Sequence, residues 1–386
     1  MEFSLAEEQQ QLQDSLRRYL ENKYTFDQRR AQLKSADKTS AAHWQAFAEF
    51  GLLGIGIPED CGGLGNTTNM SGEGSASEDT MIVMSSFGRS LVVEPYLATV
   101  VLCGSVLGQL KDNAACVTAL ASIAEGNRKM ALACYERQGR YQLSYVATTA
   151  TLEADGYLLN GAKSVVIHGD VADSFIISAR VNGKVDAKQG IALFLVDKNT
   201  PGLTLRSYAT HDGMSAADMS IVALRLPASA MISDDGYSIL ERAIGYGIAA
   251  LCAEAVGAME ALNEQTLAYL KTRKQFGVAI GTFQALQHRM VDMFIATEQA
   301  RSITILAALK VGSEDDDERR KVIAAAKALV GQSARYVGQQ AVQLHGGMGV
   351  VDELAISHYF KRLTAIDMTF GDSQHQRGQL GELLAA

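Results

Sequence analysis

The sequence predicts an α+β fold with an N-terminal helical domain, a middle antiparallel β-barrel domain and a C-terminal four-helix bundle. Three observations support this prediction. The chain of 386 residues exceeds the size at which one hydrophobic core usually stops growing. Its apolar periodicity is helical at both ends and changes to short alternating runs in the middle. No proline follows Pro227, so long uninterrupted helices can form in the last third of the chain.

The first predicted domain, residues 1–127, is rich in Ala, Leu, Glu and Gln. Apolar residues recur there every three or four positions, as in HWQAFAEFGLLGIG, which indicates helices. Ser4 and Glu7 have the spacing of a capping box at the start of the first helix. The segment 58–79, PEDCGGLGNTTNMSGEGSASED, is rich in Gly, Ser and Asn. We expect it to be an exposed loop, either a lid or a surface insertion.

The second and third domains are predicted at 128–234 and 235–386. The middle domain contains runs such as MALACY, DSFIISARV and GIALFLVDK, which are β-branched or alternating and are separated by Gly and Asp turns. In the last domain, helical patterns extend over tens of residues with short connections, which favours an antiparallel bundle. Its third long helix is preceded by DDDE, and acidic residues stabilise a helix N-terminus.

The composition excludes several classes of protein. Hydrophobic residues make up 47% of the chain and charged residues 20%, as expected for a globular protein rather than a disordered one. The net charge of -8 and the lack of a basic segment argue against a nucleic-acid partner. The acidic N-terminus does not have the pattern of a signal peptide, and no apolar run reaches the ~18 residues of a membrane span. We therefore expect a cytoplasmic protein.

Metal sites, disulfides and several common catalytic motifs are not indicated. The five cysteines are far apart and form no CxxC pair, so we expect buried free thiols. The chain has neither a GxSxG nor a GxxxxGK[ST] motif. The nearest dinucleotide motif, at Gly347 and Gly349, lacks a third glycine and follows a helical pattern rather than a strand. A Rossmann-type nicotinamide enzyme is therefore the least favoured hypothesis.

Two short motifs are more informative, KTRKQFG at 271–277 and QLHGGMG at 343–349. In the first, cationic residues complement the dipole at a helix C-terminus, and Phe276 and Gly277 are expected to close the helix. In the second, paired glycines end a helix and leave bare backbone against which a flat or phosphorylated group could lie. Each motif alone is typical of an ordinary helix end.

The segments LKTRKQFGVAIGTFQALQHRMVDM, QLHGGMGV and FKRLTAIDMTFGDSQHQR, in this order, resemble the C-terminal domain of the acyl-CoA dehydrogenases. GIPEDCGGLG resembles the loop of that family's first domain, and NGAKSVVIHGDVADSFIISAR resembles its middle domain. The similarity covers nearly all of the chain and is greatest to the small subunits of heteromeric bacterial enzymes of the pimeloyl-CoA dehydrogenase type. It implies FAD-dependent α,β-dehydrogenation of an acyl-CoA thioester, with electrons passing to an electron-transfer flavoprotein.

The resemblance also implies a cofactor site shared between subunits. In the family, one subunit holds the flavin ring and the catalytic base, and its neighbour holds the ADP portion with the RKQFG and QLHGGMG motifs. The cofactor-binding residues implied for this chain are Arg273, Gln275, Phe276, Gln284, Gln343, Gly346, Gly347 and Gln374.

The flavin-ring half departs from the family pattern. Val165 and Ile167 stand where the family usually has Trp and Thr, and neither side chain can donate a hydrogen bond. The family's glycine-rich, serine-ending stretch is replaced by CYERQGRYQLSY, residues 134–145. The two positions that hold a catalytic Glu in the family correspond to Phe370 and Gly247. Neither position carries a carboxylate.

Asp372 is the one candidate catalytic base, and it lies two residues beyond the family's usual position. Asp is also a preferred N-cap, and Ser373 and Gln376 have capping-box spacing, so the alternative is that Asp372 only caps the last helix. His168, His345 and His375 lie near these motifs, but histidines at such positions are commonly structural, and we assign them no role.

Three hypotheses for the function remain. The chain is a subunit of a heteromeric dehydrogenase and supplies the ADP-binding half of the FAD site; or it is a self-sufficient homotetrameric enzyme with Asp372 as base; or it is a structural or binding subunit without cofactor. A shared cofactor site implies a dimer of dimers, either a homotetramer or an α2β2 heterotetramer.

Overall fold

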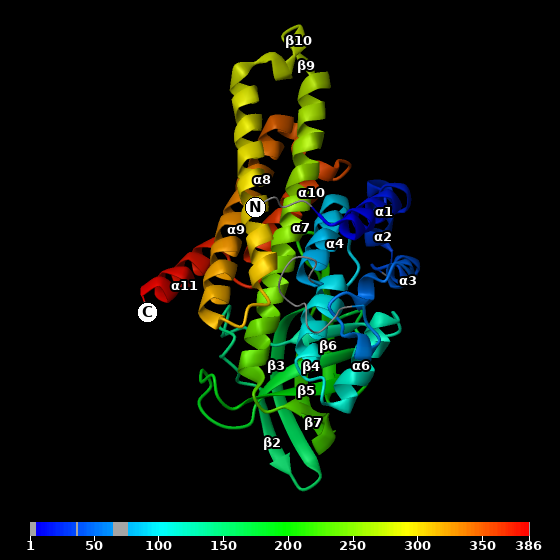
Figure 1. Cartoon of the computed structure of the whole chain (residues 1–386), viewed down its shortest axis with the longest axis vertical. Coiled ribbons are helices and arrows are strands. Elements are labelled where there is room, and N and C mark those ends of the chain that lie inside the picture. The colour runs from blue at the N-terminus through cyan, green and yellow to red at the C-terminus, as the bar shows by residue number, and fades with distance from the viewer. Residues whose placement is uncertain (1–4, 36–37, 65–75, 386) are drawn as a thin grey trace.

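The computed structural model describes residues 5–35, 38–64 and 76–385 (Figure 1). Ser4, and with it the predicted capping box, lies outside these residues, as do residues 65–75 of the loop predicted at 58–79. The part of that loop after residue 75 is not a loop, because helix α4 begins at Ala76. Glu78 and Asp79 lie in the first turn of α4, where carboxylates stabilise the helix dipole.

The N-terminal domain is helical, as predicted. Its helices pack around one apolar core that continues into the C-terminal bundle. Thr25 caps α2 by accepting a hydrogen bond from the Gln28 amide. The elements are α1 (Glu7–Lys23), α2 (Phe26–Lys34), α3 (Ala41–Glu49), the short turns Leu52–Gly54 and Glu59–Cys61, α4 (Ala76–Ser90), a π-helical segment (Leu97–Cys103), α5 (Gly104–Gly108) and α6 (Ala114–Ala124).

The middle domain is an eight-stranded sheet with the strand order β6-β7-β3-β2-β4-β5-β8 and with β1 paired to β4. Most neighbouring strands are antiparallel, as predicted, but β1 runs parallel to β4, with Met130 opposite Ser174, and β2 also pairs with β4 in parallel, with Thr149 opposite Arg180. The β2 and β3 hairpin separates these two strands in the chain and allows the parallel return. The strands are β1 (Met130–Ala133), β2 (Thr149–Glu153), β3 (Gly156–Ile167), β4 (Ser174–Arg180), β5 (Ile191–Asp197), β6 (Leu203–Ala209), β7 (Ser215–Pro227) and β8 (Met231–Ser233).

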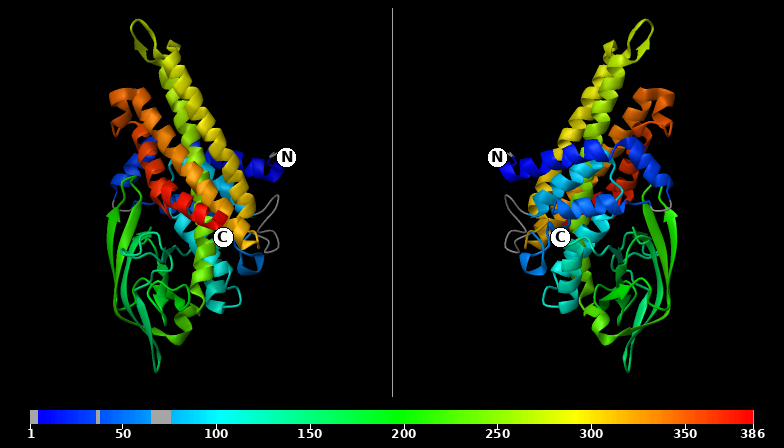
Figure 2. Two further views of the ribbon diagram at one scale, coloured as in Figure 1. Left: turned by 90° about the vertical axis from the view of Figure 1, so that its left-hand side faces the viewer. Right: turned by 90° about the vertical axis from the view of Figure 1, so that its right-hand side faces the viewer.

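The C-terminal domain is a bundle of long helices (Figure 2). In both side views, α7 and α8 extend past the other helices, and the β domain lies at the opposite end of the molecule. The elements are α7 (Gly236–Thr272), β9 (Lys274–Gln275), β10 (Val278–Ala279), α8 (Gln284–Lys310), α9 (Asp316–His345), a 3-10 turn (Gly346–Val350), α10 (Ala355–Met368) and α11 (Ser373–Ala385). This arrangement confirms the predicted fold class.

One predicted helix end was wrong. Phe276 and Gly277 do not close α7, which already ends at Thr272. They form the turn of the short β9-β10 hairpin, in which Phe276 has a positive φ of 54°. Two-residue hairpin turns use positive φ values at their central residues, so the local sequence favours a hairpin over a helix cap.

A buried charge cluster joins the three domains. The Arg362 guanidinium on α10 donates two hydrogen bonds to Glu254 of α7, at 2.5 and 2.7 Å, and one to Asp212 of the β domain, at 2.7 Å. Arg29 of α2 donates to the carbonyl oxygens of Asp212, at 3.3 Å, and of Leu91, at 2.7 Å. Burial alone would raise the pKa of Asp212, but the Arg362 guanidinium holds it below its usual value.

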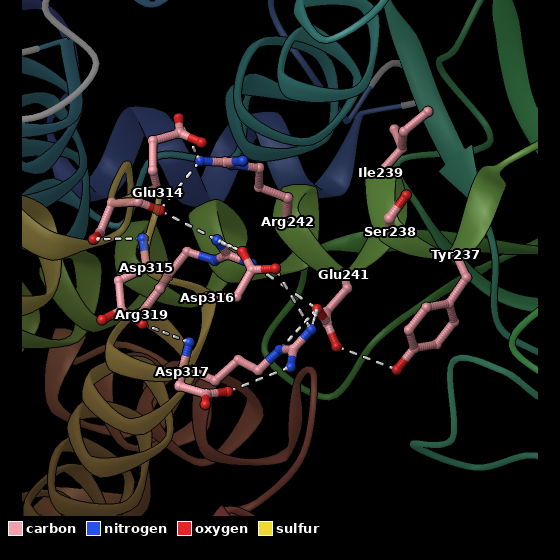
Figure 3. A network of polar contacts seen from close by, with 12 residues as sticks. Tyr237, Ser238, Ile239, Glu241, Arg242, Glu314, Asp315, Asp316, Asp317 and Arg319 are labelled. Carbon is pink, nitrogen blue, oxygen red and sulfur yellow. Dashed lines mark hydrogen bonds and ion pairs between the residues drawn. The ribbon is translucent and has the colours of Figure 1, made fainter.

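A second polar network fixes the start of α7 against the turn between α8 and α9 (Figure 3). Arg242 donates to the Glu314 carboxylate at 3.1 Å, and Arg320 donates to Glu241 at 2.7 Å. Tyr237 donates to Glu241 as well, at 3.2 Å. These groups are partly exposed, so we attribute to them positioning of the helix ends rather than a large share of the stability.

Replacing Arg362 with Met tests the contribution of the buried cluster. We expect Arg362→Met to lower the free energy of unfolding by roughly 3 to 5 kcal/mol, because Glu254 and Asp212 would lose their buried partner. Chemical denaturation of the purified protein measures this change. The matched control is Arg206→Met, which removes an exposed partner of Asp218 and should cost below about 1 kcal/mol. Equal effects of the two substitutions would contradict the proposed role of the cluster.

Candidate functional site

A cavity of about 1230 Å³ lies where the β domain meets the two helical domains. Strand β3 contributes Val165 and Ile167 to its wall, and the turn between α10 and α11 contributes Phe370 and Asp372. Tyr135, from the segment that follows β1, lies on the same wall. The cavity wall therefore brings together Val165, Ile167, Phe370 and part of the 134–145 segment, and Gly247 lies directly against Phe370.

The segment 134–145 is anchored to the sheet by a buried ion pair. Glu136 accepts a hydrogen bond from the Lys163 ammonium at 2.8 Å, and also accepts from the Thr148 amide and hydroxyl at 3.0 and 2.7 Å. Lys163 donates further to the Ser178 hydroxyl at 3.0 Å. Burial would raise the pKa of Glu136, but Lys163 and the other donors hold it below its usual value. The sequence that replaces the family's glycine-rich stretch thus has a fixed position.

Asp372 caps helix α11. Its Oδ1 accepts hydrogen bonds from the amides of Gln374, at 3.0 Å, and His375, at 2.8 Å. The capping alternative is therefore satisfied in the structure. Ser373 is the first residue of the helix, so Ser373 and Gln376 do not form a capping box; instead, Gln376 Nε2 donates to the Phe370 carbonyl oxygen at 2.8 Å.

The turn that carries Phe370 and Asp372 is held by a buried lysine from α9. Lys327 Nζ donates to the carbonyl oxygens of Ile366, Asp367 and Gly371, at 2.9, 2.7 and 2.9 Å. Burial lowers the pKa of this ammonium, and the nearby Asp367 and Asp372 carboxylates act in the opposite direction. Because three carbonyl oxygens share one cation, the backbone of the turn has little freedom to shift.

Both family positions for a catalytic Glu converge on one spot, and neither provides a carboxylate. A Cβ placed on Gly247 would lie 3.0 Å from Phe370 Cε2 and 2.6 Å from Leu102 Cδ2. The Phe370 ring therefore packs directly over the bare backbone of α7. The same ring also stacks with Tyr135, with ring centroids 6.1 Å apart and an interplanar angle of 26°. An apolar aromatic pair lies where the resemblance would place the base.

Strained backbone is concentrated around this cavity. Arg140, Val165, His168 and Phe370 have φ values between 49° and 60°, and all four line the cavity. Val165 is β-branched, which makes this conformation unfavourable, and it lies beside an irregularity in the pairing of β3 with β7. Backbone strain of this kind persists where a site needs a particular shape. The cavity thus combines a strained backbone with side chains that lack the expected chemistry.

The implied ADP-binding residues lie elsewhere, at the end of the molecule opposite the β domain (Figure 1). Arg273 and Gln275 are exposed at the β9-β10 hairpin, and the Phe276 side chain is 92% exposed. Phe276 contacts the ring of Phe283, next to Gln284 at the start of α8. A fully projecting aromatic ring on a hairpin tip is typical of a contact with another molecule.

A ring contact holds the 343–349 motif beside the end of α7, next to the 271–277 motif. Tyr269, one turn before Arg273, stacks on His345 with centroids 4.3 Å apart and an interplanar angle of 25°. On either side of His345 in the chain, the exposed residues Gln343, Gly346 and Gly347 surround the end of α9. Gly346 has a φ of 61° and a ψ of -140°, and a Cβ at this position would meet no atom within 4 Å. The backbone is thus open to a ligand from outside.

Helix α7 separates the two halves. Gly247 lies beside the cavity, and Arg273 follows the same helix, which at 1.5 Å per residue places them roughly 40 Å apart. This separation exceeds the length of a dinucleotide cofactor. Gln374, which lies beside Asp372 near the cavity, is the one implied cofactor residue outside the hairpin end. The structure therefore divides the implied residues into two groups that no single cofactor can bridge within one chain.

His168 is buried in the cavity wall. Its Nε2 lies 3.0 Å from the Val93 carbonyl oxygen, so this nitrogen carries the proton and donates. Its Nδ1 has no hydrogen-bond partner among the described residues. Burial lowers the pKa of His168 to about 4, which outweighs the opposing effect of the Asp170 carboxylate. His168 is therefore a neutral structural residue near neutral pH.

The sequence did not indicate several residues that shape the site. Tyr135, Lys163 and Lys327 act through contacts with residues distant in the chain. Tyr135 and Lys163 lie in segments that were compared with the family, but no local pattern assigns them these contacts. Other expectations hold: all five cysteines are free and buried. The described part of the chain contains no cluster of three or more metal-ligating side chains. It also contains no helix long and apolar enough to cross a bilayer.

Three family models match the chain in succession. They are the acyl-CoA dehydrogenase N-terminal domain over residues 6–106, the middle domain over 131–225 and the C-terminal domain over 234–385. Together they account for the helical, β and helical order of the structure. The motifs discussed above all lie inside the matched ranges.

The sequence of this chain is similar to those of individual relatives over almost its full length. A probable acyl-CoA dehydrogenase of Bacillus subtilis is 28% identical, over 98% of each chain. The solved structure of a Tcur3481-Tcur3483 steroid ACAD variant is 28% identical over 99% of each chain, with a TM-score of 0.86. The butyryl-CoA dehydrogenase from Megasphaera elsdenii, at 24% identity, shares the fold with a TM-score of 0.89 over 100% of each chain.

The buried His168 predicts a pH dependence of stability. Its pKa is about 4 in the folded chain and about 6.5 when unfolded, so its contribution is complete above pH 6.5 and is lost as the pH falls toward 4. The loss amounts to about 3 kcal/mol. His168→Gln, which can still donate to the Val93 carbonyl oxygen, should flatten the stability profile measured by denaturation between these pH values. His288→Gln, on an exposed face of α8, should leave the profile unchanged.

Substitutions of Asp372 separate its capping role from a catalytic one. Asp372→Ala should destabilise α11 by about 1 kcal/mol, whereas Asp372→Asn, whose amide oxygen can cap the helix, should cost far less. Amide hydrogen exchange along α11 measures both effects, and Glu382→Ala on the same helix controls for loss of charge. Equal protection of α11 in the Ala and Asn variants would contradict the capping role.

Proposed function

Because this chain belongs to the acyl-CoA dehydrogenase family, we propose that it is one subunit of a heteromeric FAD-dependent enzyme that dehydrogenates an acyl-CoA thioester. In this proposal the chain supplies the ADP-binding half of the FAD site, and its partner subunit supplies the flavin pocket and the catalytic base. The observation that supports it best is the separation of the two halves. The exposed hairpin end has the expected residues, and the distant cavity does not.

The side chains at the hairpin end fit the ADP portion of FAD. A guanidinium such as Arg273 pairs well with a pyrophosphate, and Phe276 offers an aromatic face. The open backbone at Gly346 and Gly347 would admit a close approach of the cofactor. FAD, when bound, accepts the hydride that leaves the β-carbon of the substrate. The role of this chain is to bind and orient the cofactor through its ADP end.

The cavity of this chain fits the flavin ring poorly. Val165 and Ile167 offer no side-chain donor to the ring, and Phe370 fills the space next to Gly247. A carboxylate within ~3.5 Å of the α-carbon is needed to remove its proton. The self-sufficient alternative requires Asp372 for this step, yet Asp372 Oδ1 already accepts two backbone hydrogen bonds. We therefore favour a partner's carboxylate as base.

Assembly with a second subunit agrees with the exposed apolar surface. Val291, Phe294 and Ile295 form a stripe along one face of α8, and each is about half exposed. The Tcur3481-Tcur3483 steroid ACAD, 28% identical to this chain, bears two component names. By analogy we propose an α2β2 heterotetramer that passes its electrons to an electron-transfer flavoprotein and acts in the cytoplasm. A non-catalytic subunit without cofactor is the remaining alternative.

The experiment compares the chain purified alone with the chain coexpressed with its partner subunit. We expect the lone chain to carry no stoichiometric flavin and the coexpressed pair to contain one FAD, measured by the visible absorbance of oxidised flavin. Arg273→Gln should lower the FAD affinity of the pair about ten- to hundredfold, because a charge-assisted hydrogen bond to phosphate is lost. The matched control, Lys271→Gln, removes the same charge two residues earlier and should bind FAD normally.

The opposite result is equally well defined. The chain would be the self-sufficient enzyme if, purified alone, it held stoichiometric FAD whose visible absorbance is bleached by acyl-CoA. In that case Asp372→Asn should retain FAD but abolish the bleaching. A pair without flavin under all conditions would instead indicate a structural or binding subunit.

A further inference from the structure

We propose that Tyr135 and Phe370 form an aromatic latch that excludes a flavin ring from this chain's own cavity. The latch would direct the cofactor of an assembly to the partner's pocket. This inference rests on the proposed function and adds the residues that decide which subunit of a pair carries the flavin ring.

The latch is a direct contact across the cavity wall. The two rings stack with centroids 6.1 Å apart, and Tyr135 and Phe370 both line the cavity. Phe370 has a φ of 60°, an unfavourable conformation for a bulky residue, and its ring lies against the bare backbone of Gly247. A third flat ring cannot enter this stack unless one of the two moves away.

A second contact closes the other side of the same turn. Tyr141, from the same segment as Tyr135, packs on His375 with centroids 5.1 Å apart and an interplanar angle of 47°. Burial raises the pKa of Tyr141, and the nearby Asp372 carboxylate raises it further, which places this phenol close to the turn. The segment 134–145 therefore covers the turn at both Phe370 and His375, with Asp372 between them.

Each residue of the latch adjoins a backbone position that a buried lysine fixes. Glu136 follows Tyr135, and its carboxylate accepts from Lys163 at 2.8 Å. Gly371 follows Phe370, and its carbonyl oxygen accepts from Lys327 at 2.9 Å. Since each lysine is almost completely buried, neither ring can swing out through backbone motion without breaking an ion pair or a buried hydrogen bond. The latch is thus held closed from both sides.

The lack of side-chain donors at Val165 and Ile167 is not the only obstacle to a flavin ring in this cavity. The fixed position of the 134–145 segment adds a steric one. The cavity has room for a ligand, at about 1230 Å³, but its wall at the turn is already occupied by stacked rings. Removal of the two rings should therefore open the site even though Val165 and Ile167 remain.

Lumiflavin, a bare flavin ring without phosphate or adenine, is a suitable probe because it does not depend on a partner's ADP-binding residues. We expect the full chain to bind lumiflavin weakly, and the double variant Tyr135→Ala, Phe370→Ala to bind it at least about tenfold more tightly, measured by quenching of flavin fluorescence. Tyr145→Ala is the matched control. It truncates an aromatic residue of the same segment that packs against Gly139 and does not line the cavity, and it should behave as the unmodified chain.

Two results would overturn the latch. If the double variant binds no more tightly than the unmodified chain, the lost donors rather than the rings exclude flavin; if the unmodified chain already binds tightly, nothing excludes it. Should the Ala pair fail to fold by circular dichroism, Tyr135→Leu with Phe370→Leu preserves apolar volume without the rings and answers the same question. The proposed function is tested separately by the FAD content of the coexpressed pair, so the latch can fail while that function stands.

Discussion

The buried guanidinium of Arg362 is the interaction on which the rest of the structure depends. It binds Glu254 of the bundle and Asp212 of the β domain, and Arg29 adds the N-terminal domain through the Asp212 carbonyl oxygen. Charges taken out of water are retained only when they are well paired, so the three domains are held in one relative position. The cavity lies at that junction, and its walls come from all three domains. The shape of the cavity therefore depends on the contacts of Arg362 rather than on any single domain.

The length of α7 sets the second constraint. The helix begins next to the β domain and ends at the hairpin, so a chain with this fold cannot bring its own cavity and its own hairpin to one dinucleotide. Under the proposed function, another subunit therefore completes the cofactor site. In this chain the hairpin end carries an exposed arginine, an exposed aromatic ring and open glycines, whereas Val165, Ile167 and Phe370 in the cavity wall offer neither a side-chain donor nor a carboxylate. The asymmetry is thus between two distant regions of one chain.

The sequence predicted the fold class and most long helices because periodicity and caps are local properties. It also predicted that Asp372 could cap a helix, since Asp is a good N-cap whatever its tertiary surroundings. It failed at Phe276, where a positive φ turns an apparent helix end into a hairpin, and at β1, whose parallel partner β4 is distant in the chain. The stacking of Tyr135 on Phe370 could not be predicted, because it joins residues more than two hundred positions apart and no local pattern specifies it.

A structure of the chain with its partner subunit and FAD, solved by crystallography or cryo-electron microscopy, tests the central claim most directly. The account predicts the adenine and pyrophosphate against Arg273 and the Gly346 backbone of this chain, with the flavin ring inside the partner subunit and no flavin beside Val165. A flavin ring bound in this chain's own cavity, with Asp372 directed at the substrate, would contradict it.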